Sequence, residues 1–308
     1  MKYQSKINDL YRDMTSSVKG IVLKDEPLKN HTYFKIGGPA GILAEPEDTE
    51  DLVMVLKLIK KHGVDYFVIG NGTNLLVSDE GFNGAVVKIC DKFSYFKRNE
   101  NRITAGAGVL LSTLAKFIAK ESLEGFEFAS GIPGCLGGAV CMNAGAYGGE
   151  IKQIVKSVKC VDFDGNIHEF SNKEMEFAYR HTKITDSEYI AIEAELELKY
   201  GDRDEIMSRI KELNEKRMSK QPLNMPSAGS TFKRPEVGYA SKLIEDAGLK
   251  GLMYKGAMVS DKHSGFIVNY DNACCDDVLD LMRIVISTVY DKFGIRLEPE
   301  VKIIGTKL

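Results

Sequence analysis

Residues 130–150 read SGIPGCLGGAVCMNAGAYGGE and contain seven of the chain's 29 glycines. Glycine adopts positive φ angles and lets a ligand approach the backbone closely. We therefore expect no ordinary helix or strand here, but a loop that wraps a rigid ligand with its own N–H groups. Small apolar residues such as Ala139 and Ala144 would suit a flat aromatic body as well as a phosphate. The alternative is a structural loop that binds nothing, although long loops in compact domains are uncommon unless they have a function.

A second glycine turn follows a predicted strand at residues 64–69. An amphipathic helix at residues 48–62 leads into this strand, which runs into GNGTNLL at residues 70–76. Such a turn offers convergent N–H donors to a phosphate. The pattern is not the dinucleotide-binding fingerprint, because Leu75 replaces the third glycine and residues 78–84 form a turn cluster instead of a crossover helix. Two purely structural turns remain the alternative.

The rest of the chain is predicted from hydrophobic periodicity and turn residues. We expect strands at residues 85–90, 102–108, 155–163, 167–170, 189–200, 257–259, 265–268 and 295–304. We expect helices at residues 112–122, 203–220, 239–247 and 276–293. The alternating strand at residues 189–200 gives way to a polar helix, and we place a domain boundary after residue 201.

The composition is that of an ordinary soluble protein long enough for two domains. Of the 308 residues, 44% are hydrophobic and 28% are charged, with a net charge of −3 that argues against a general nucleic-acid binder. The N-terminus has no apolar core of a signal peptide, and no stretch approaches 18 apolar residues, so we expect a cytoplasmic protein without membrane contact. Six cysteines and five histidines show no metal-ligand spacing, and we predict no metal site.

Three positions carry candidate chemistry, each with a structural alternative. Arg180 precedes the long strand, where its guanidinium could bind a carboxylate through two hydrogen bonds, or simply be solvated. Ser230 lies in a loop of small residues and is either exposed to a ligand or an ordinary turn residue. Glu298 and Glu300 would share one face of the last strand, where an edge charge is the default explanation.

Taken in order, these pieces resemble the UDP-N-acetylenolpyruvoylglucosamine reductase family. The resemblance covers nearly the whole chain, and the ordered set of motifs is specific although each one alone is weak. The motifs are Asn30–Ala40 (NHTYFKIGGPA), Gly70–Leu76, Ser130–Gly145, Tyr179–Arg180, Ser227–Pro235, His263–Asn269 and Leu297–Val301.

The resemblance implies an α+β protein with a two-part FAD-binding domain of the vanillyl-alcohol-oxidase type and a smaller α+β substrate-binding domain. We assign residues 1–201 to the FAD-binding domain, split near residues 85–100, and residues 202–299 to the substrate-binding domain, with residues 300–308 returning to the first. It also implies non-covalent FAD, NADPH as co-substrate and UDP-N-acetylenolpyruvoylglucosamine as substrate, in peptidoglycan precursor synthesis. NADPH would reduce the flavin, which then passes hydride to the enol ether.

The resemblance also implies roles for individual residues. Ser230 would protonate the substrate carbon, while Arg180 and Glu300 stabilise the enolic intermediate. The implied cofactor-binding residues are Gly70, Asn71, Gly72, Thr73, Asn74, Leu75, Gly131, Pro133, Gly134, Gly137, Ala139, Asn143, Ala144 and Gly145. The implied substrate-binding residues are Tyr179, Lys233, Arg234 and Asn269.

The chain departs from the family pattern at three places. Residues 181–188 (HTKITDSE) are too short for the tyrosine-bearing loop of one family branch, so the chain resembles the branch that lacks this lid. Arg234 stands where many relatives have Asn, and Cys135 replaces a usual Ser or Thr. Two alternative functions are an FAD-dependent oxidase of the same fold acting on an alcohol or hydroxy acid, and a nucleotide-sugar binding protein without redox chemistry.

Overall fold

The computed structural model describes residues 2–185 and 187–308, and the chain divides into two compact units. The first unit comprises Met1–Lys24, Ile42–Asn71 and Gly84–Arg217. The second comprises Asp25–Gly41, Gly72–Asn83 and Met218–Leu308. Each unit is therefore built from segments that are far apart in the sequence. The functional domain boundary after residue 201 stays a prediction.

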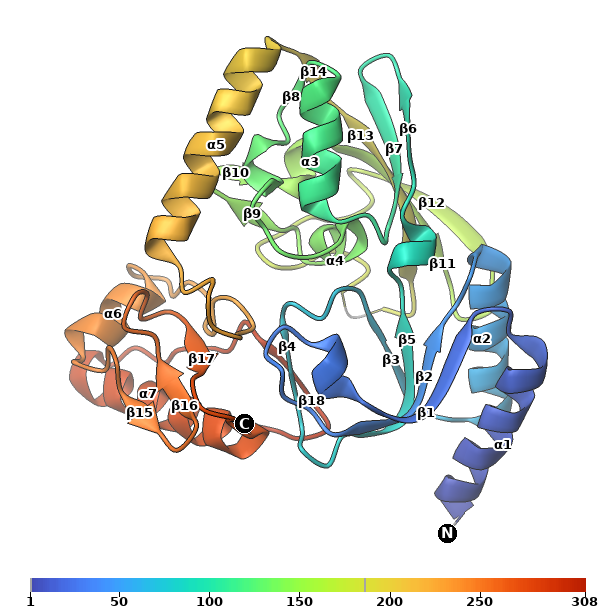
Figure 1. Ribbon diagram of the computed structural model, residues 1–308, viewed down its shortest axis with the longest axis horizontal. Coiled ribbons are helices and arrows are strands. Elements are labelled where there is room, and N and C mark those ends of the chain that lie inside the picture. The colour runs from blue at the N-terminus through green and yellow to red at the C-terminus, as the bar shows by residue number, and fades with distance from the viewer. Residues whose placement is uncertain (1, 186) are drawn as a thin grey trace. The chain divides into compact units, whose positions relative to one another are not determined.

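The bounds of the elements follow the chain from N- to C-terminus (Figure 1). The α-helices are α1 (Lys2–Ser17), α2 (Thr49–His62), α3 (Leu111–Lys120), α4 (Leu136–Cys141), α5 (Arg203–Lys220), α6 (Ala240–Asp246) and α7 (Cys275–Phe293). The strands up to the glycine-rich segment are β1 (Ile21–Pro27), β2 (Pro39–Glu45), β3 (Tyr66–Ile69), β4 (Leu75–Val77), β5 (Phe82–Lys88), β6 (Phe96–Asn99), β7 (Arg102–Gly106) and β8 (Leu123–Glu124). The later strands are β9 (Gly145–Ala146), β10 (Gly149–Glu150), β11 (Val155–Val161), β12 (Ile167–Ser171), β13 (Ile190–Glu197), β14 (Lys199–Tyr200), β15 (Met253–Tyr254), β16 (Ala257–Val259), β17 (Ile267–Asn269) and β18 (Lys302–Ile304).

Helix α2 confirms the amphipathic pattern read from residues 48–62. The Asp48 side chain caps its N-terminus by accepting a hydrogen bond from the N–H of Asp51 at 2.8 Å, and Gly63 ends the helix in the left-handed conformation with φ 57°. Its apolar face joins α1 and the sheet with strand order β1-β2-β5-β3 in one core. In that sheet β3 and β5 run parallel, and the segment between them contains the short strand β4 and no helix.

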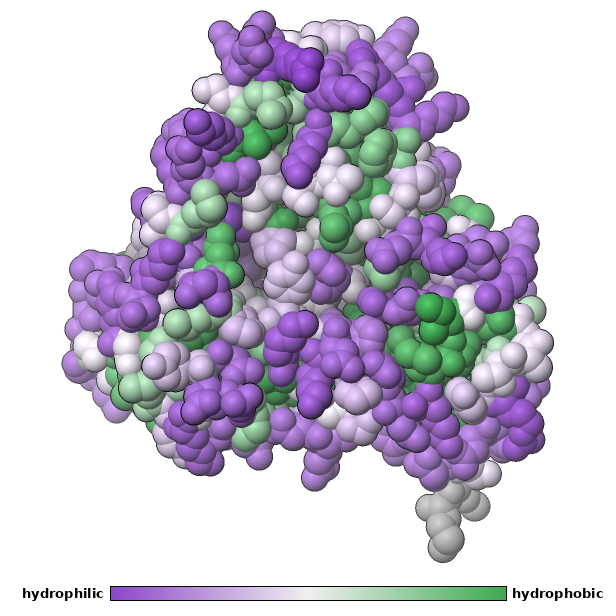
Figure 2. Space-filling view, viewed as in Figure 1, coloured by the Kyte–Doolittle hydropathy of each residue, from purple (hydrophilic) through white to green (hydrophobic). Residues whose placement is uncertain are grey.

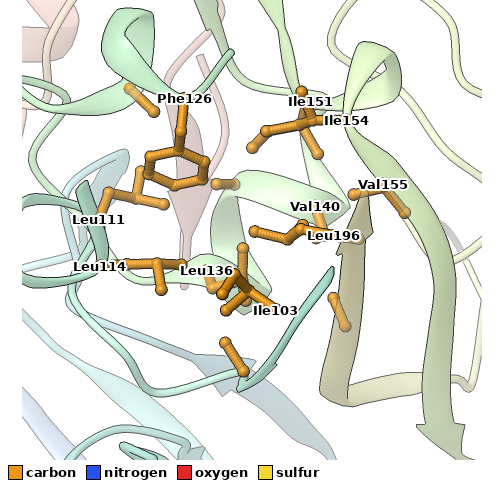
Figure 3. Close-up of a cluster of buried hydrophobic side chains, with 14 of the residues drawn as sticks. Ile103, Leu111, Leu114, Phe126, Leu136, Val140, Ile151, Ile154, Val155 and Leu196 are labelled. Atoms are coloured by element: carbon orange, nitrogen blue, oxygen red, sulfur yellow. The ribbon is translucent and has the colours of Figure 1, made fainter. Parts of the chain in front are cut away.

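A second sheet has the strand order β12-β11-β13-β7-β6, with antiparallel neighbours. Strand β13 confirms the predicted alternation, because Ile190, Ile192, Ala194 and Leu196 are buried while the glutamates between them are more exposed. Helices α3 and α4 contribute Leu114, Leu136 and Val140 to the core beside this sheet (Figure 3).

The second unit has its own core. Helix α7 packs against the small antiparallel sheet β15-β16-β17, and its buried face includes Val278, Leu281 and Val285. Strand β18 pairs in parallel with β4, with Ile303 opposite Leu76. This pairing places β18, near the C-terminus, beside the end of the turn at residues 70–76. Both paired segments belong to the second unit.

The expectation that residues 130–150 form no helix or strand is wrong. Helix α4 and the short pair β9–β10 lie within this stretch. The glycines are compatible with a helix because they permit close packing: a Cβ atom on Gly137 would lie 2.8 Å from Cβ of Ala107. Here glycine lets a helix approach another part of the chain, which composition alone does not reveal.

The predicted strand at residues 295–304 is also too long. Only β18, Lys302–Ile304, is a strand, while Pro299 forms an isolated bridge with Phe232. Proline has no N–H to donate to a ladder, so the regular pairing that the alternating sequence suggested does not extend through it. Glu298 and Glu300 therefore lie on either side of a bridge and not within a continuous strand.

Helix α1 and strands β1 and β2 were not predicted from the sequence. Helix α1 has no acidic residue in its first turn and no basic residue in its last, so the usual end signals are missing. Its buried residues Ile7, Leu10 and Met14 nevertheless have helical spacing. The hydrophobic spacing alone would have identified this helix.

Figure 2 shows one face of the molecule, with hydrophilic side chains over the upper part of α5. That helix confirms the predicted inward positions Ile206 and Leu213, which are buried, while Ile210 is half-buried. Among the described residues, no helix is both long and apolar enough to cross a membrane.

Candidate active site

The glycine-rich segment, residues 130–150, is held against the end of strand β7 by backbone hydrogen bonds. The N–H of Leu136 donates to the carbonyl of Val109 at 2.9 Å, and the N–H of Gly137 donates to that of Ala107 at 2.8 Å. The N–H groups of Ala139 and Ala144 also donate to backbone carbonyls. Gly137, Ala139 and Ala144, which were predicted to bind the cofactor, therefore use their N–H groups within the protein. Any contact of these residues with a ligand would involve their other atoms.

Two glycines in the first part of the same segment keep their amides available. Within the described residues, the N–H groups of Gly131 and Gly134 donate no hydrogen bond to another part of the protein. Gly134 has φ 133°, a backbone conformation that favours glycine. The N–H of Ile132 between the two glycines is not available, because it donates to the carbonyl of Ala129 at 3.0 Å. Pro133 lies between them and has no N–H to contribute.

Two buried polar atoms beside Gly131 have no hydrogen-bond partner in the described part of the chain, Ser130 Oγ and Arg217 Nε. Arg217, at the end of α5, is only 9% exposed. A Cβ atom on Gly131 would lie 3.3 Å from Arg217 Nε and 2.5 Å from Asn214 Oδ1, so α5 packs directly on this glycine. Burial lowers the pKa of the Arg217 guanidinium, opposed by its interaction with Tyr147, but the group stays charged at neutral pH.

This arrangement is chemically suited to an anionic group. A buried guanidinium nitrogen and a buried hydroxyl without partners are costly unless a ligand supplies acceptors. Beside them lies Gly131, whose N–H donates no hydrogen bond within the described residues. The residues present therefore fit a phosphate-bearing cofactor such as FAD.

Arg217 and Ser130 were not among the residues predicted to bind the cofactor. A signal for Arg217 was present in the sequence, because it continues the inward stripe formed by Ile206, Ile210 and Leu213 at helical spacing. Charged residues are rarely buried unless they are paired, so an arginine on the buried face of an amphipathic helix indicates a partner or a ligand. Nothing in the sequence marks Ser130 apart from its place in the segment.

The turn at residues 70–76 has tight backbone packing that requires glycine. A Cβ atom on Gly70 would overlap Cys135 Sγ, so the cysteine that replaces the usual Ser or Thr packs directly against this turn. Gly72 has φ 62°, and a Cβ atom there would overlap the carbonyl oxygen of His31. Both glycines therefore allow close contacts within their own units. Asn71, Thr73 and Leu75 complete the turn.

Asn74 uses its side chain within the second unit. Its Nδ2 donates to the backbone carbonyl of Glu300 at 3.1 Å, and its own carbonyl accepts from the N–H of Lys302 at 3.0 Å. Asn74 therefore holds the chain at Glu300, a role that its prediction as a cofactor-binding residue did not include.

Arg180 lies at the tip of a two-residue turn. Ala178 and His181 close this turn, with the N–H of Ala178 donating to the carbonyl of His181 at 2.9 Å and the reverse bond at 3.3 Å. Arg180 has φ 54°, in the left-handed region that costs a non-glycine residue about 1–3 kcal/mol. Its guanidinium carbon lies 5.2 Å from the centroid of the Tyr179 ring. Backbone strain at a residue with a fixed charge supports a functional role.

Ser230 and Glu300 lie on neighbouring segments of the second unit. The N–H of Glu300 donates to the carbonyl of Thr231 at 2.8 Å, directly after Ser230. Ser230 itself is exposed, whereas Thr231 is buried and its Oγ1 accepts from the N–H of Ile267 at 2.9 Å. A buried, hydrogen-bonded neighbour thus holds the backbone while the Ser230 hydroxyl faces outward.

The environment of Glu298 differs from that of Glu300. Glu298 pairs with Lys233 at 3.2 Å and its side chain is 72% exposed, as expected for a surface ion pair. Glu300 is half-buried beside the Ser230 segment. The difference supports the choice of Glu300 over Glu298, which the sequence pattern could not make.

The predicted substrate-binding residues have varied surroundings. Tyr179 is half-exposed beside Arg180, and the Arg234 guanidinium lies 4.4 Å from the centroid of the Tyr239 ring. The amide of Asn269 makes structural bonds, because Nδ2 donates to Phe34 and Oδ1 accepts from Ala273. Asn269 is therefore already engaged within its own unit.

The segment at residues 181–188, predicted to be too short for a lid, is tied down at its start. The hydroxyls of Thr182 and Thr185 both donate to the carbonyl of Cys141, at 2.9 and 2.8 Å. Residue 186 lies outside the described residues.

The strain at Arg180 leads to a first prediction. Arg180→Gly and Arg180→Ala both remove the guanidinium, but only glycine relieves the left-handed conformation. The glycine variant should have a free energy of unfolding about 1 kcal/mol above that of the alanine variant. Urea unfolding of both proteins measures this difference, and both should lose turnover. An alanine variant as stable as the glycine variant would show that the turn carries no strain.

Comparison with known proteins identifies relatives over the full length of the chain. A family model described as "FAD binding domain" matches residues 40–171, and one described as "UDP-N-acetylenolpyruvoylglucosamine reductase, C-terminal domain" matches residues 221–304. The first match contains Gly131 and Gly134, and the second contains Ser230 and Glu300.

The curated relatives carry the name UDP-N-acetylenolpyruvoylglucosamine reductase. That of Clostridioides difficile is 52% identical over 96% of this chain and 98% of its own length. That of Alkaliphilus oremlandii is 50% identical over 96% and 97%. A crystal structure of the enzyme from Thermus caldophilus matches with a TM-score of 0.79 at 34% identity, covering 92% of this chain and 98% of the other.

These matches confirm the predicted α+β protein with an FAD-binding domain, and they confirm the resemblance drawn from the ordered motifs. The chain belongs to the UDP-N-acetylenolpyruvoylglucosamine reductase family, whose members are FAD-containing oxidoreductases.

Proposed function

We propose that this protein reduces UDP-N-acetylenolpyruvoylglucosamine with NADPH through non-covalently bound FAD, as a step in peptidoglycan precursor synthesis in the cytoplasm. The observation that carries the proposal is the unsatisfied Nε of buried Arg217 together with the unsatisfied Ser130 hydroxyl, which lie beside Gly131 of the matched FAD-binding domain and suit an anionic cofactor group. The length and identity of the family match support the substrate. An oxidase of the same fold is not favoured.

The chain's own residues would hold the cofactor through charge and backbone donors. Arg217 and Ser130 would bind anionic oxygens, together with the N–H groups of Gly131 and Gly134. When bound, FAD would supply the transfer of hydride from NADPH to the substrate. We assign the tight turn at Gly70 to the same site, because its backbone already packs against Cys135 in the glycine-rich segment.

The three predicted catalytic residues would act on the enol-ether group and its carboxylate. Arg180 carries a permanent charge in a planar fork, which matches a carboxylate whose negative charge grows during the reaction. Ser230 would donate a proton to the neighbouring carbon, since a carbanion-like centre is a strong base. Glu300 would help stabilise the enolic form. Tyr179, Lys233, Arg234 and Asn269 remain proposed substrate contacts.

The purified protein should be yellow, and acid denaturation should release its FAD. Adding UDP-N-acetylenolpyruvoylglucosamine should cause NADPH consumption, followed at the absorbance of NADPH. A colourless protein that binds the nucleotide sugar would favour a binding protein without redox chemistry. A bound flavin that oxygen reoxidises quickly but the enol ether does not would favour an oxidase.

Arg217→Met should change FAD affinity and protein stability in opposite directions. The variant removes a buried charge, so the FAD-free protein should be as stable as the parent or more stable. FAD affinity should fall by about 10- to 100-fold, because a charge-assisted bond to the cofactor is lost. Flavin fluorescence quenching measures the affinity, and urea unfolding measures the stability.

The matched control is Lys216→Met, next to Arg217 in α5 but paired with Glu212 on the exposed side of the helix. This change should leave FAD affinity unaltered. Equal affinities in the Arg217 variant and the parent would remove Arg217 from the cofactor site.

Ser230→Ala should separate the two halves of the reaction. Reduction of the bound flavin by NADPH should proceed at the parent rate, while reoxidation by the enol ether should slow by roughly 10² to 10⁴, the usual contribution of a positioned general acid. Rapid-mixing absorbance measures both steps. Ser227→Ala, in the same segment, is the control. Equal slowing of both steps by Ser230→Ala would indicate a structural turn residue.

A further inference from the structure

The side chain of Asn143 joins the glycine-rich segment to the turn that carries Arg180. Asn143 is 1% exposed, and its Nδ2 donates to the carbonyl of Ala178 at 3.0 Å and to Glu150 Oε2 at 3.2 Å. Its Oδ1 accepts from the N–H of Lys152 at 3.0 Å. The amide therefore uses both donors and an acceptor inside the protein, in a place without solvent access.

The bond to Ala178 lies at the base of the Arg180 turn. The carbonyl of Ala178 accepts from Asn143 Nδ2 and also from the N–H of His181, which closes the turn. Asn143 itself has φ 43°, so its own backbone is held in the left-handed region. The carbonyl of Ala178 thus links the Asn143 side chain to the turn that carries Arg180, and both residues have left-handed backbone conformations.

The other side of the turn is attached to the same segment. Thr182 is fully buried, and its hydroxyl donates to the carbonyl of Cys141, two residues before Asn143. Both flanks of the turn, Ala178 and Thr182, are therefore bound to residues 141–143. The position of the Arg180 backbone depends on the end of helix α4.

We propose that Asn143 is a positioning residue for Arg180, fixing the turn that presents the guanidinium while leaving FAD binding to other residues. The sequence placed Asn143 among the cofactor-binding residues, but its amide is directed to Ala178, Glu150 and Lys152. This inference rests on the proposed role of Arg180. A displacement of about 1 Å in such a group can cost about 100-fold in rate, so the tether has a measurable consequence.

The substitution Asn143→Asp tests the tether with almost no change in shape. It replaces the two N–H donors by an acceptor that faces the carbonyl of Ala178 and the carboxylate of Glu150. The new carboxylate oxygen then repels the oxygens of Ala178 and Glu150, to which the amide had donated hydrogen bonds. The matched control is Asn172→Asp, because Asn172 Nδ2 also donates to two backbone carbonyls, those of Lys152 and Val155, neither of which belongs to the Arg180 turn.

The first measurement is hydrogen exchange in the FAD-free protein. In Asn143→Asp, a peptide covering residues 176–185 should exchange at least about tenfold faster than in the parent, because the turn has lost a buried hydrogen bond. The same peptide should exchange at the parent rate in Asn172→Asp. Unchanged exchange in Asn143→Asp would overturn the tether itself.

The second measurement is rapid mixing of the FAD-loaded protein. FAD affinity and flavin reduction by NADPH should match the parent within about twofold, while reoxidation by the enol ether slows by about 10- to 100-fold. Adding Asn143→Asp to Arg180→Ala should cause no further slowing, since the tether acts through Arg180. The positioning role would be overturned if the double variant reoxidised more slowly than Arg180→Ala alone. It would also be overturned if FAD affinity in Asn143→Asp fell by as large a factor as the reoxidation rate.

The single variant Arg180→Ala keeps this inference distinct from the proposed function. If it reoxidises as fast as the parent, the proposed role of Arg180 fails, and with it the positioning role, whereas the exchange result still decides whether the tether exists. Should Asn143→Asp not fold, Thr182→Val preserves the side-chain shape and removes the bond to Cys141. It should give the same exchange and kinetic pattern, and parent-like behaviour in both would overturn the inference.

Discussion

The pairing of helix α4 with the end of strand β7 is the constraint on which the rest of the candidate site depends. Leu136 and Gly137 donate to Val109 and Ala107, and the absence of a side chain at Gly137 permits this approach. Once α4 is fixed, the residues after it are fixed as well. Cys141 and Asn143 then offer the acceptor and the donors that hold the Arg180 turn.

Two asparagines, one buried and one half-buried, hold the backbone at candidate site residues. Asn143 holds the backbone at Ala178, and Asn74 holds the backbone at Glu300. Each belongs to a motif that, in the sequence, suggested contact with a cofactor. An amide removed from solvent must satisfy its donors, and here the acceptors include carbonyls at or near candidate catalytic residues. These glycine-rich motifs therefore organise the backbone around the candidate catalytic residues.

Arg217 represents the opposite case, a buried guanidinium that has one nitrogen without a partner. Its Nε and the hydroxyl of Ser130 have no partner in the described part of the chain. Burying such groups costs stability in the free protein, and a ligand that supplies acceptors would recover that cost on binding. The close approach of α5 to Gly131 places this charge beside unpaired backbone amides. Affinity for an anion and reduced stability of the free protein then have the same physical origin.

The sequence by itself determined the features that depend on local spacing. The position of α2 followed from hydrophobic period, an acidic cap and a terminal glycine, and β13 followed from strict alternation. The ordered motifs were enough to identify the family. The candidates Arg180, Ser230 and Glu300 came from that resemblance, because their residue types alone had ordinary structural explanations.

Only the tertiary structure decided what each polar atom contacts. Glycine density suggested a loop, whereas long-range packing on Ala107 stabilises helix α4. The bridge from Pro299 to Phe232 interrupts a strand that alternation had predicted. Whether the Asn143 amide meets a ligand or the carbonyl of Ala178 depends on residues 35 positions away. The hydrogen-bonding capacity of a side chain is a local property that can be read from the sequence, whereas its partners depend on which distant segments folding brings next to it.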